Sequence, residues 1–238
     1  MKALTLGTTI LAGALVFAPA GWGAYQAGDV KDGGSISGSV KFKGTPPAPK
    51  KLEVSKDQEV CGKTPKTDQS LIVANGNLVN AVVTITDISK GKKVELKKVT
   101  LDQKGCEYQP HVLAFPAGST MAIVNPDGIL HNVHSYSKVN SPFNMAQPKF
   151  KKTMDVKIDK PETIQLKCDV HSWMEGWLVA TPNPYFNVTD KSGNFKLTDV
   201  PPGTYNVEVW HEKLGKTAQK VTVKAKEDAK VNFEMAGK

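Results

Sequence analysis

Residues 163–180 read TIQLKCDVHSWMEGWLVA, two strand-like segments around a short loop. Residues 163–167 and 176–180 have the length and residue types of neighbouring strands. The loop between them carries Cys168, His171 and Met174, which are spaced three residues apart. Because a tight connection between paired strands gathers its side chains beyond the strand ends, we expect a thiolate, an imidazole and a thioether to converge on one point.

A second imidazole is available from residues 125–134, NPDGILHNVH, which follow another predicted strand. His131 completes a set of two histidines, one cysteine and one methionine. This set is the ligand signature of a type 1 copper site, with the thioether as the weak axial ligand. The residues therefore predict one copper ion held by His131, Cys168, His171 and Met174.

Other interpretations of these residues stay open. Zinc sites more often use additional Cys or His, and a thioether is a poor zinc ligand. Cys168 and His171 can instead form a nucleophile–base pair, although both lie in one short loop. The third possibility is that Cys168, Met174 and Trp173 are ordinary buried core residues.

Three further histidines need separate assignment. His134 is three residues from His131, so in a strand the two side chains point to opposite faces. His134 is therefore a possible extra ligand, but a position on the surface or beside the ligands is favoured. His111 begins a predicted strand and is also a possible ligand, although a hydrogen-bonded structural role is expected. His211 lies near the C-terminus and is expected to be structural.

The rest of the chain has the pattern of β-structure. Residues 35–42 alternate apolar with small or polar side chains, as a half-buried strand does. Short strand-like segments separated by Gly, Pro, Asn and Asp continue to the C-terminus, and no window has a helical period. This predicts an all-β fold, a sandwich or barrel. The further segments expected to form strands are 71–73, 80–88, 112–115, 120–124, 187–189, 195–197, 205–210, 218–223 and 231–233.

The N-terminus resembles an export signal. Lys2 precedes an apolar run that ends at Ala18-Pro19-Ala20, so residues 1–20 are expected to be a cleaved signal peptide and 21–34 a linker. No later stretch is long enough to span a bilayer, so no transmembrane segment is expected after cleavage. These features predict a periplasmic or secreted protein.

Composition excludes one class of partner. The 238 residues are 39% hydrophobic and 23% charged, which is typical of a globular protein. The net charge of +8 rests on lysine alone, since the chain has no arginine. Proteins that recognise nucleic acid normally use arginine to contact phosphates and guanine edges, so no nucleic-acid partner is expected.

The three cysteines of an exported chain predict one disulfide. Cys168 belongs to the His/Met cluster, whereas Cys61 and Cys106 lie outside the other motifs. The economical arrangement is a Cys61–Cys106 disulfide with Cys168 left as a thiolate.

Residues 105–182 resemble the cupredoxins. The Cys168–Gly176 loop is similar to the short ligand loop of amicyanin, and residues 110–133 are similar to the segment that leads to the first histidine in plastocyanin. The resemblance implies a Greek-key β-sandwich that holds type 1 copper. It also implies that Asn132 ties the two ligand loops together and orients a backbone donor toward the Cys168 sulfur, a kind of bond that tunes the potential.

The C-terminal residues 183–238 resemble a second, small module, the carboxypeptidase-regulatory-like β-sandwich. The resemblance lies in residues 185–197 and in Asp199-Val200-Pro201-Pro202-Gly203-Thr204-Tyr205. Residues 36–40 resemble the opening strand of the same module. Residues 35–104 therefore belong either to this accessory sandwich or to the cupredoxin. Chains of this combination resemble so-called methylamine utilisation proteins.

Together these features predict a carrier of single electrons and not an enzyme. The expected partner is a redox protein such as a c-type cytochrome or a quinoprotein. Trp173, Trp177 and Pro142-Phe143 are candidates for an apolar docking rim or, equally, for core. The alternatives are a copper chaperone or buffer, and a structural or carbohydrate-binding β protein.

Overall fold

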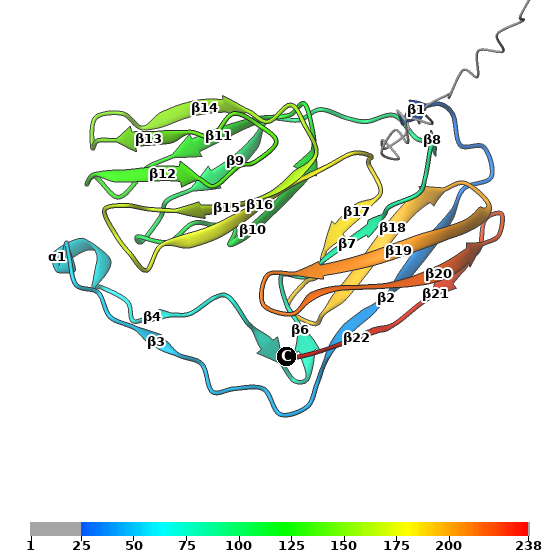
Figure 1. Cartoon of the computed structure of the whole chain (residues 1–238), viewed down its shortest axis with the longest axis horizontal. Helices are drawn as coiled ribbons and strands as arrows, with labels where there is room; N and C mark the ends of the chain where they lie inside the picture. Colours follow the sequence, from blue (N-terminus) through cyan, green and yellow to red (C-terminus); the bar gives the residue numbers. More distant parts are fainter. Residues whose placement is uncertain (1–24, 238) are drawn as a thin grey trace, which may run out of the picture.

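The computed structural model describes residues 25–237, which form two β-sandwiches side by side (Figure 1). The predicted all-β fold with two sandwiches is confirmed. The predicted signal peptide lies outside the described residues. Within the predicted linker, β1 (Gln26–Ala27) pairs in parallel with β8 (Lys90–Gly91), so part of this segment is ordered against the fold. No helix in the described range is long and apolar enough to cross a membrane.

The first sandwich packs a five-stranded sheet against a three-stranded one. The strand order is β10-β16-β15-β12-β13 in the larger sheet and β14-β11-β9 in the smaller. Buried residues of both sheets form one core that includes Phe115, Ile123, Ile164, Leu166 and Leu178. The strands are β9 (Val99–Asp102), β10 (Val112–Pro116), β11 (Thr120–Val124), β12 (His131–Ser135), β13 (Asn144–Gln147), β14 (Thr153–Lys157), β15 (Glu162–Lys167) and β16 (Glu175–Thr181).

Strand register brings the two ligand-bearing segments to the same end of the larger sheet. β15 and β16 form an antiparallel hairpin whose last pair is Lys167 with Glu175, so residues 168–174 close it. β12 pairs with β15 through His134 opposite Lys167. Because β12 runs antiparallel to β15, the earlier residue His131 extends past the end of β15, beside the hairpin loop.

The second sandwich is built from both ends of the chain. One sheet has the order β17-β7-β19-β20; the other has the order β18-β2-β6-β5, with β21 and β22 pairing with β2. Their buried side chains form a separate apolar core. The strands are β2 (Gly34–Lys43), β5 (Val73–Ala74), β6 (Asn77–Leu78), β7 (Val82–Ile85), β17 (Phe186–Val188), β18 (Asn194–Val200), β19 (Gly203–His211), β20 (Gly215–Val223), β21 (Asp228–Lys230) and β22 (Phe233–Ala236).

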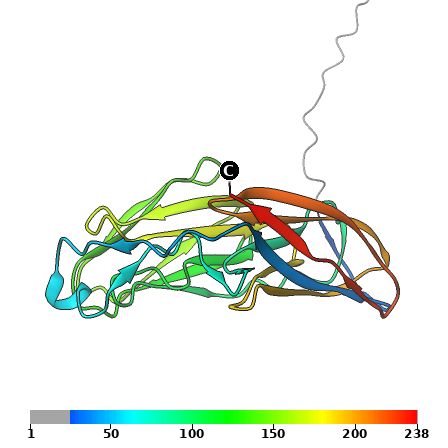
Figure 2. The same ribbon diagram turned by 90° about the horizontal axis from the view of Figure 1, so that it is seen from below.

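Residues 35–104 are shared between the two sandwiches. β2, β5, β6 and β7 lie in the second sandwich, whereas β9 lies in the first. Between β2 and β5, residues 44–72 form what we call the strap, which leaves the second sandwich and reaches the far end of the first (Figures 1 and 2). The strap contains β3 (Lys51–Leu52), the one-turn helix α1 (Gln58–Cys61) and β4 (Lys66–Thr67).

The two sandwiches touch through a small apolar and polar contact. Val82 of β7 packs with Val112 and Val179 of the first sandwich. The rings of Trp177 and Trp210 meet edge to face, with centroids 5.3 Å apart. The contact thus joins β10 and β16 to the second sandwich, beginning at Trp177 near the start of β16.

Candidate metal centre

Three predicted ligands converge in the interior of the first sandwich. The donor atoms of His131, Cys168 and His171 all lie within 4.8 Å of one another. The two Nδ1 atoms are 3.0 Å apart, and Cys168 Sγ is 3.7 Å from His171 Nδ1. The histidines are fully buried and Cys168 is 3% exposed. A single ion can therefore contact all three donors without contact to bulk water.

The hairpin loop is a closed turn that also buries Met174. The Cys168 N–H donates to the Met174 carbonyl at 3.1 Å, and the Met174 N–H donates to the His171 carbonyl at 2.9 Å. Met174 is buried in the same core as Cys168 and Trp173. The spacing of three residues thus places these side chains together because the turn is fixed by its own backbone bonds.

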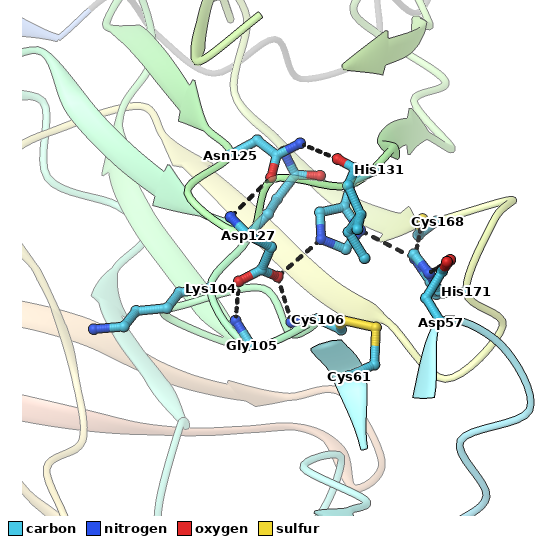
Figure 3. Close-up of polar contacts among 12 residues, drawn as sticks. Asp57, Cys61, Lys104, Gly105, Cys106, Asn125, Asp127, His131, Cys168 and His171 are labelled. Carbon is cyan, nitrogen blue, oxygen red and sulfur yellow. Dashed lines mark hydrogen bonds and ion pairs between the residues drawn. A yellow bond between two sulfur atoms is a disulfide. The ribbon is translucent and has the colours of Figure 1, made fainter. Parts of the chain in front are cut away.

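Each histidine uses its other ring nitrogen to contact a carboxylate (Figure 3). His131 Nε2 is 2.9 Å from Asp127 Oδ2, and His171 Nε2 is 2.9 Å from Asp57 Oδ2. Asp127 also accepts bonds of 2.7 Å from the N–H groups of Gly105 and Cys106. A carboxylate on Nε2 favours the tautomer with its proton there and leaves the Nδ1 lone pair for a ligand bond.

Neither carboxylate was among the residues predicted from the sequence. Asp127 lies four residues before His131, within residues 125–134, so its closeness in the chain could have identified it as a partner of His131. Asp57 lies 114 residues before His171 in a segment without a metal-binding pattern. No local pattern identifies it.

Asn132 links the two ligand segments. Its side-chain oxygen accepts a 2.6 Å bond from the Asp169 N–H, and its side-chain nitrogen donates to Asn144 at 2.6 Å and to Asp169 at 3.2 Å. These bonds connect β12 with the hairpin loop, the role that the cupredoxin resemblance implies for Asn132. Tyr108 adds a bond of 2.6 Å to the Asn132 carbonyl.

The surroundings of Cys168 favour a thiolate. Burial alone would raise the pKa of this thiol, but hydrogen bonds from His131 and His171, and from the backbone N–H groups of Asn132 and His171, lower it to about 6. Burial would likewise lower the pKa of His131, yet its partners Asp127 and Cys168 raise it. The site therefore holds an anionic sulfur among donors at neutral pH.

The donor set fits copper. Bonds of about 2.0–2.3 Å from one ion to nitrogen and sulfur place such donors roughly 3–4 Å apart. The two distances to His171 Nδ1, 3.0 Å and 3.7 Å, lie in this range. A thiolate with two imidazoles and a neighbouring thioether suits both oxidation states of copper. His131, Cys168 and His171 are the residues that would hold the ion, with Met174 beside them.

The other histidines lie elsewhere. His134 Nδ1 is 3.1 Å from Asp169 Oδ1 and its ring stacks on Tyr136, on the outer face of the sheet. His111 Nε2 contacts Glu212 of the β19–β20 connection, between the two sandwiches. His211 is buried, and this burial lowers its pKa to about 4. Neither His134 nor His111 lies in the donor cluster, and His211 is neutral at pH 7.

The aromatic residues suggested as a docking rim are used for packing. Trp173 is 9% exposed; its Nε1 donates to the Cys106 carbonyl at 3.1 Å, and its ring packs on His171. Trp177 donates to Glu212 at 2.9 Å and packs on Trp210, facing the second sandwich. Phe143 packs partly against the first core. The geometry therefore supports a packing role for both tryptophans.

The predicted disulfide is present. Cys61 of α1 is bonded to Cys106, and Cys168 is free and buried. The bond attaches the strap to the first sandwich beside the donor cluster (Figure 3).

Comparison with known families and curated proteins identifies one part of the chain. A family profile described as "Carboxypeptidase regulatory-like domain" matches residues 179–236, which include β17 to β22 of the second sandwich. A search among curated proteins finds no match. The relation to methylamine utilisation proteins stays a prediction.

Similar solved structures are copper proteins. Amicyanin from Paracoccus versutus is 18% identical with a TM-score of 0.32, over 42% of this chain and 97% of amicyanin. A purple cupredoxin from Nitrosopumilus maritimus is 20% identical with a TM-score of 0.31, over 35% of this chain and 100% of the other. A Cu-containing nitrite reductase from Thermus scotoductus is 23% identical with a TM-score of 0.34, over 38% of this chain and 24% of the reductase. The similarity thus spans about a quarter of that larger protein, and similarity of this size carries no functional argument by itself.

Proposed function

We propose that this chain is an exported type 1 copper protein that carries single electrons between redox partners. The observation that supports it most strongly is the buried convergence of His131 Nδ1, His171 Nδ1 and Cys168 Sγ. When bound, copper supplies a one-electron Cu(II)/Cu(I) couple. The chain supplies a fixed set of donors in a dry interior.

Burial of the donors favours a carrier over an enzyme or a metal buffer. A substrate must reach the metal for bond chemistry, and an exchangeable buffer needs ligands that a second protein can contact. His131 and His171 have no exposed surface and Cys168 has 3%. Electrons, unlike atoms, can pass through the surrounding side chains.

The proposed location is the periplasm or the cell exterior. The Cys61–Cys106 disulfide is typical of oxidising compartments. The signal-like sequence of residues 1–20 agrees with export.

The partner is proposed to be an acidic redox protein, such as an acidic c-type cytochrome, that docks at a groove beside the metal centre. The groove has a volume of about 570 Å³ and is lined by Lys56, Asp57, Gly128, Ile129, Leu130, Pro148, Lys149, Phe150 and Val170. Leu130 is 44% exposed and Phe150 is 81% exposed. Asp57 both lines this groove and contacts His171, so one carboxylate separates the groove from a candidate ligand.

Charge around the groove agrees with an acidic partner. Lys56 and Lys149 line the groove. Lys151 and Lys152, close to Lys149 in the chain, are exposed, as are Lys56 and Lys149. Within residues 25–237, none of these four lysines forms an ion pair with an acidic residue. Unpaired positive charge around an apolar centre steers a negatively charged partner and speeds association.

Replacement of Lys149 by Glu is expected to slow electron exchange with an acidic c-type cytochrome. Reversal of a rim charge acts mainly on the association rate, so we expect about a tenfold decrease at low salt that disappears at high salt. Stopped-flow kinetics over a salt series measure it, with Lys220→Glu on β20 of the second sandwich as control. Equal effects of the two variants would exclude the groove as the docking site.

The first experiment is the visible and EPR spectrum of the mature protein with one equivalent of Cu(II). We expect an intense thiolate charge-transfer band that is absent in Cys168→Ser, because serine cannot supply the thiolate. The control Ser172→Ala changes an exposed residue of the same loop and should keep the band. A colourless wild-type complex, or no binding, would contradict the proposal and favour a copper buffer or a structural role.

A further inference from the structure

The strap places a carboxylate against the ring nitrogen of His171 that faces away from the donor cluster. Asp57, at the start of α1, places Oδ2 2.9 Å from His171 Nε2. His171 is fully buried, whereas the Asp57 side chain is 36% exposed. This carboxylate of the strap therefore lies between the Nε2 atom of His171 and solvent.

The strap is connected to the other histidine as well. The Cys61 N–H donates to the Asp57 carbonyl at 2.8 Å, which links the two ends of α1. Cys61 is bonded to Cys106, and the Cys106 N–H donates to Asp127 Oδ2 at 2.7 Å. Asp127 Oδ2 lies 2.9 Å from His131 Nε2.

These contacts form one continuous path from ligand to ligand. It runs from His171 through Asp57 and α1 to the disulfide, and from there through Asp127 to His131 (Figure 3). Trp173 anchors the middle of the path, since its Nε1 donates to the Cys106 carbonyl at 3.1 Å and its ring packs on His171.

We propose that the strap clamps the metal centre, with Asp57 and Asp127 as positioning residues for the two histidines and the Cys61–Cys106 disulfide as the bond that holds both carboxylates in place. The inference rests on the proposed copper function. Groups that bond to the outer nitrogen of a ligating histidine fix its ring and its tautomer. Here one disulfide supports both of these groups, so opening it is expected to loosen both ligands.

The bond between Asp57 and His171 is tested first in the metal-free protein. In nitrogen-15 NMR spectra, wild type should show His171 with its proton on Nε2, protected from exchange with water. Asp57→Ala should lose this protection, and Asp57→Asn should retain part of it because its amide oxygen still accepts a bond. Glu59→Ala, on the same helix, is the matched control and should match wild type. Unchanged protection in Asp57→Ala would overturn the clamp whether or not copper binds.

Copper retention is the second readout. Loss of a bond to a ligating histidine typically weakens metal binding about 10–100-fold. We expect transfer of copper to a chelator to be faster by this factor in Asp57→Ala and in Cys61→Ser/Cys106→Ser, but not in Glu59→Ala. Circular dichroism verifies that each variant is folded.

The outcomes separate the clamp from the copper function. If wild type shows the thiolate band and Asp57→Ala releases copper at the wild-type rate, the clamp is wrong and the proposed function stands. If wild type binds no copper while the NMR result is as expected, the proposed function fails and Asp57 only stabilises the fold. If the disulfide variant unfolds, Asp57→Ala and Asp57→Asn still decide the role of the carboxylate.

Discussion

At the scale of single residues, each histidine of the candidate centre has two different partners. Nδ1 of His131 and of His171 faces the donor cluster, while Nε2 of each faces a carboxylate. A buried imidazole without these carboxylates would have a free N–H in an apolar interior, which is costly. The same residue type is used differently at His134 and His111, which contact Asp169 and Glu212 away from the donors.

Glu162, at the start of β15, shows how one carboxylate organises a loop. Its oxygens accept bonds from Ser137 Oγ at 2.6 Å and from the backbone N–H groups of Lys138, Val139 and Asn140 at 2.5–3.0 Å. Burial would raise the pKa of Glu162, but these bonds lower it to about 2. The loop that connects β12 with β13 is thus held by a charged acceptor.

We expect Glu162→Gln to destabilise the protein at pH 7 by about 1–2 kcal/mol, after allowance for solvent screening. The pKa of Glu162 is lower in the folded state than the ordinary value of 4.5, so its contribution is present above pH 4.5 and is lost as the pH falls toward 2. The difference between wild type and variant should therefore vanish near pH 2. Urea unfolding at several pH values measures it.

Glu234, an exposed residue of β22, provides the control for that measurement. Glu234→Gln should leave the free energy of unfolding within about 0.5 kcal/mol of wild type, as surface substitutions usually do. A Glu162→Gln difference that is the same at pH 7 and at pH 2 would show that the charge has no part in it.

At the scale of elements, β2 is the strand on which the second sandwich depends. It pairs with β18, β6, β21 and β22. At Gly38 the connection between β21 and β22 runs so close to β2 that a Cβ atom would lie 1.6 Å from the Val231 carbonyl oxygen. Glycine is required here by the approach of another backbone and not by its own conformation.

Gly38→Ala is therefore expected to destabilise the second sandwich, because the backbone of residue 231 has to move. Overpacking of this kind costs typically about 1–3 kcal/mol. Thermal unfolding followed by circular dichroism should show a lower Tm. Gly28→Ala is the control, since its Cβ would meet only the flexible Lys90 side chain at 3.6 Å. Equal Tm values for the two variants would contradict the close approach.

At the scale of the whole molecule, Glu212 connects the two sandwiches. It lies in the β19–β20 connection, is 6% exposed, and accepts bonds from Trp177 Nε1 at 2.9 Å and from His111. Both donors belong to the first sandwich. The carboxylate therefore satisfies two partly buried polar groups across the contact.

Glu212→Ala should weaken this contact, because it leaves two partly buried donors without an acceptor. Each unsatisfied buried group costs about 1–3 kcal/mol. We expect calorimetry to show a lower Tm and a separation of the unfolding of the two sandwiches. Glu208→Ala, which removes a partly exposed ion pair with Lys216, is the control. A Tm equal to that of the control would show that Glu212 does not stabilise the contact.

Much of this protein could be predicted from residues close together in the chain. The 168–174 loop between two strands places Cys168, His171 and Met174 together because a hairpin turn is a local structure. Alternation of side chains along residues 35–42 identifies β2, since a strand with one buried face has a period of two. The Cys61–Cys106 disulfide could also be predicted, because Cys168 belongs to the His/Met cluster and leaves the other two cysteines to pair.

Only the tertiary structure determined which residues support these groups from a distance. Asp57 reaches His171 across 114 residues, and Glu212 reaches His111 across 101. The sequence also left open how residues 35–104 divide, and strand pairing assigned them to both sandwiches. A hydrogen bond between distant segments needs only one suitable atom on each side, so it leaves no periodicity or spacing in the sequence, and the packing of the whole chain decides which atoms meet.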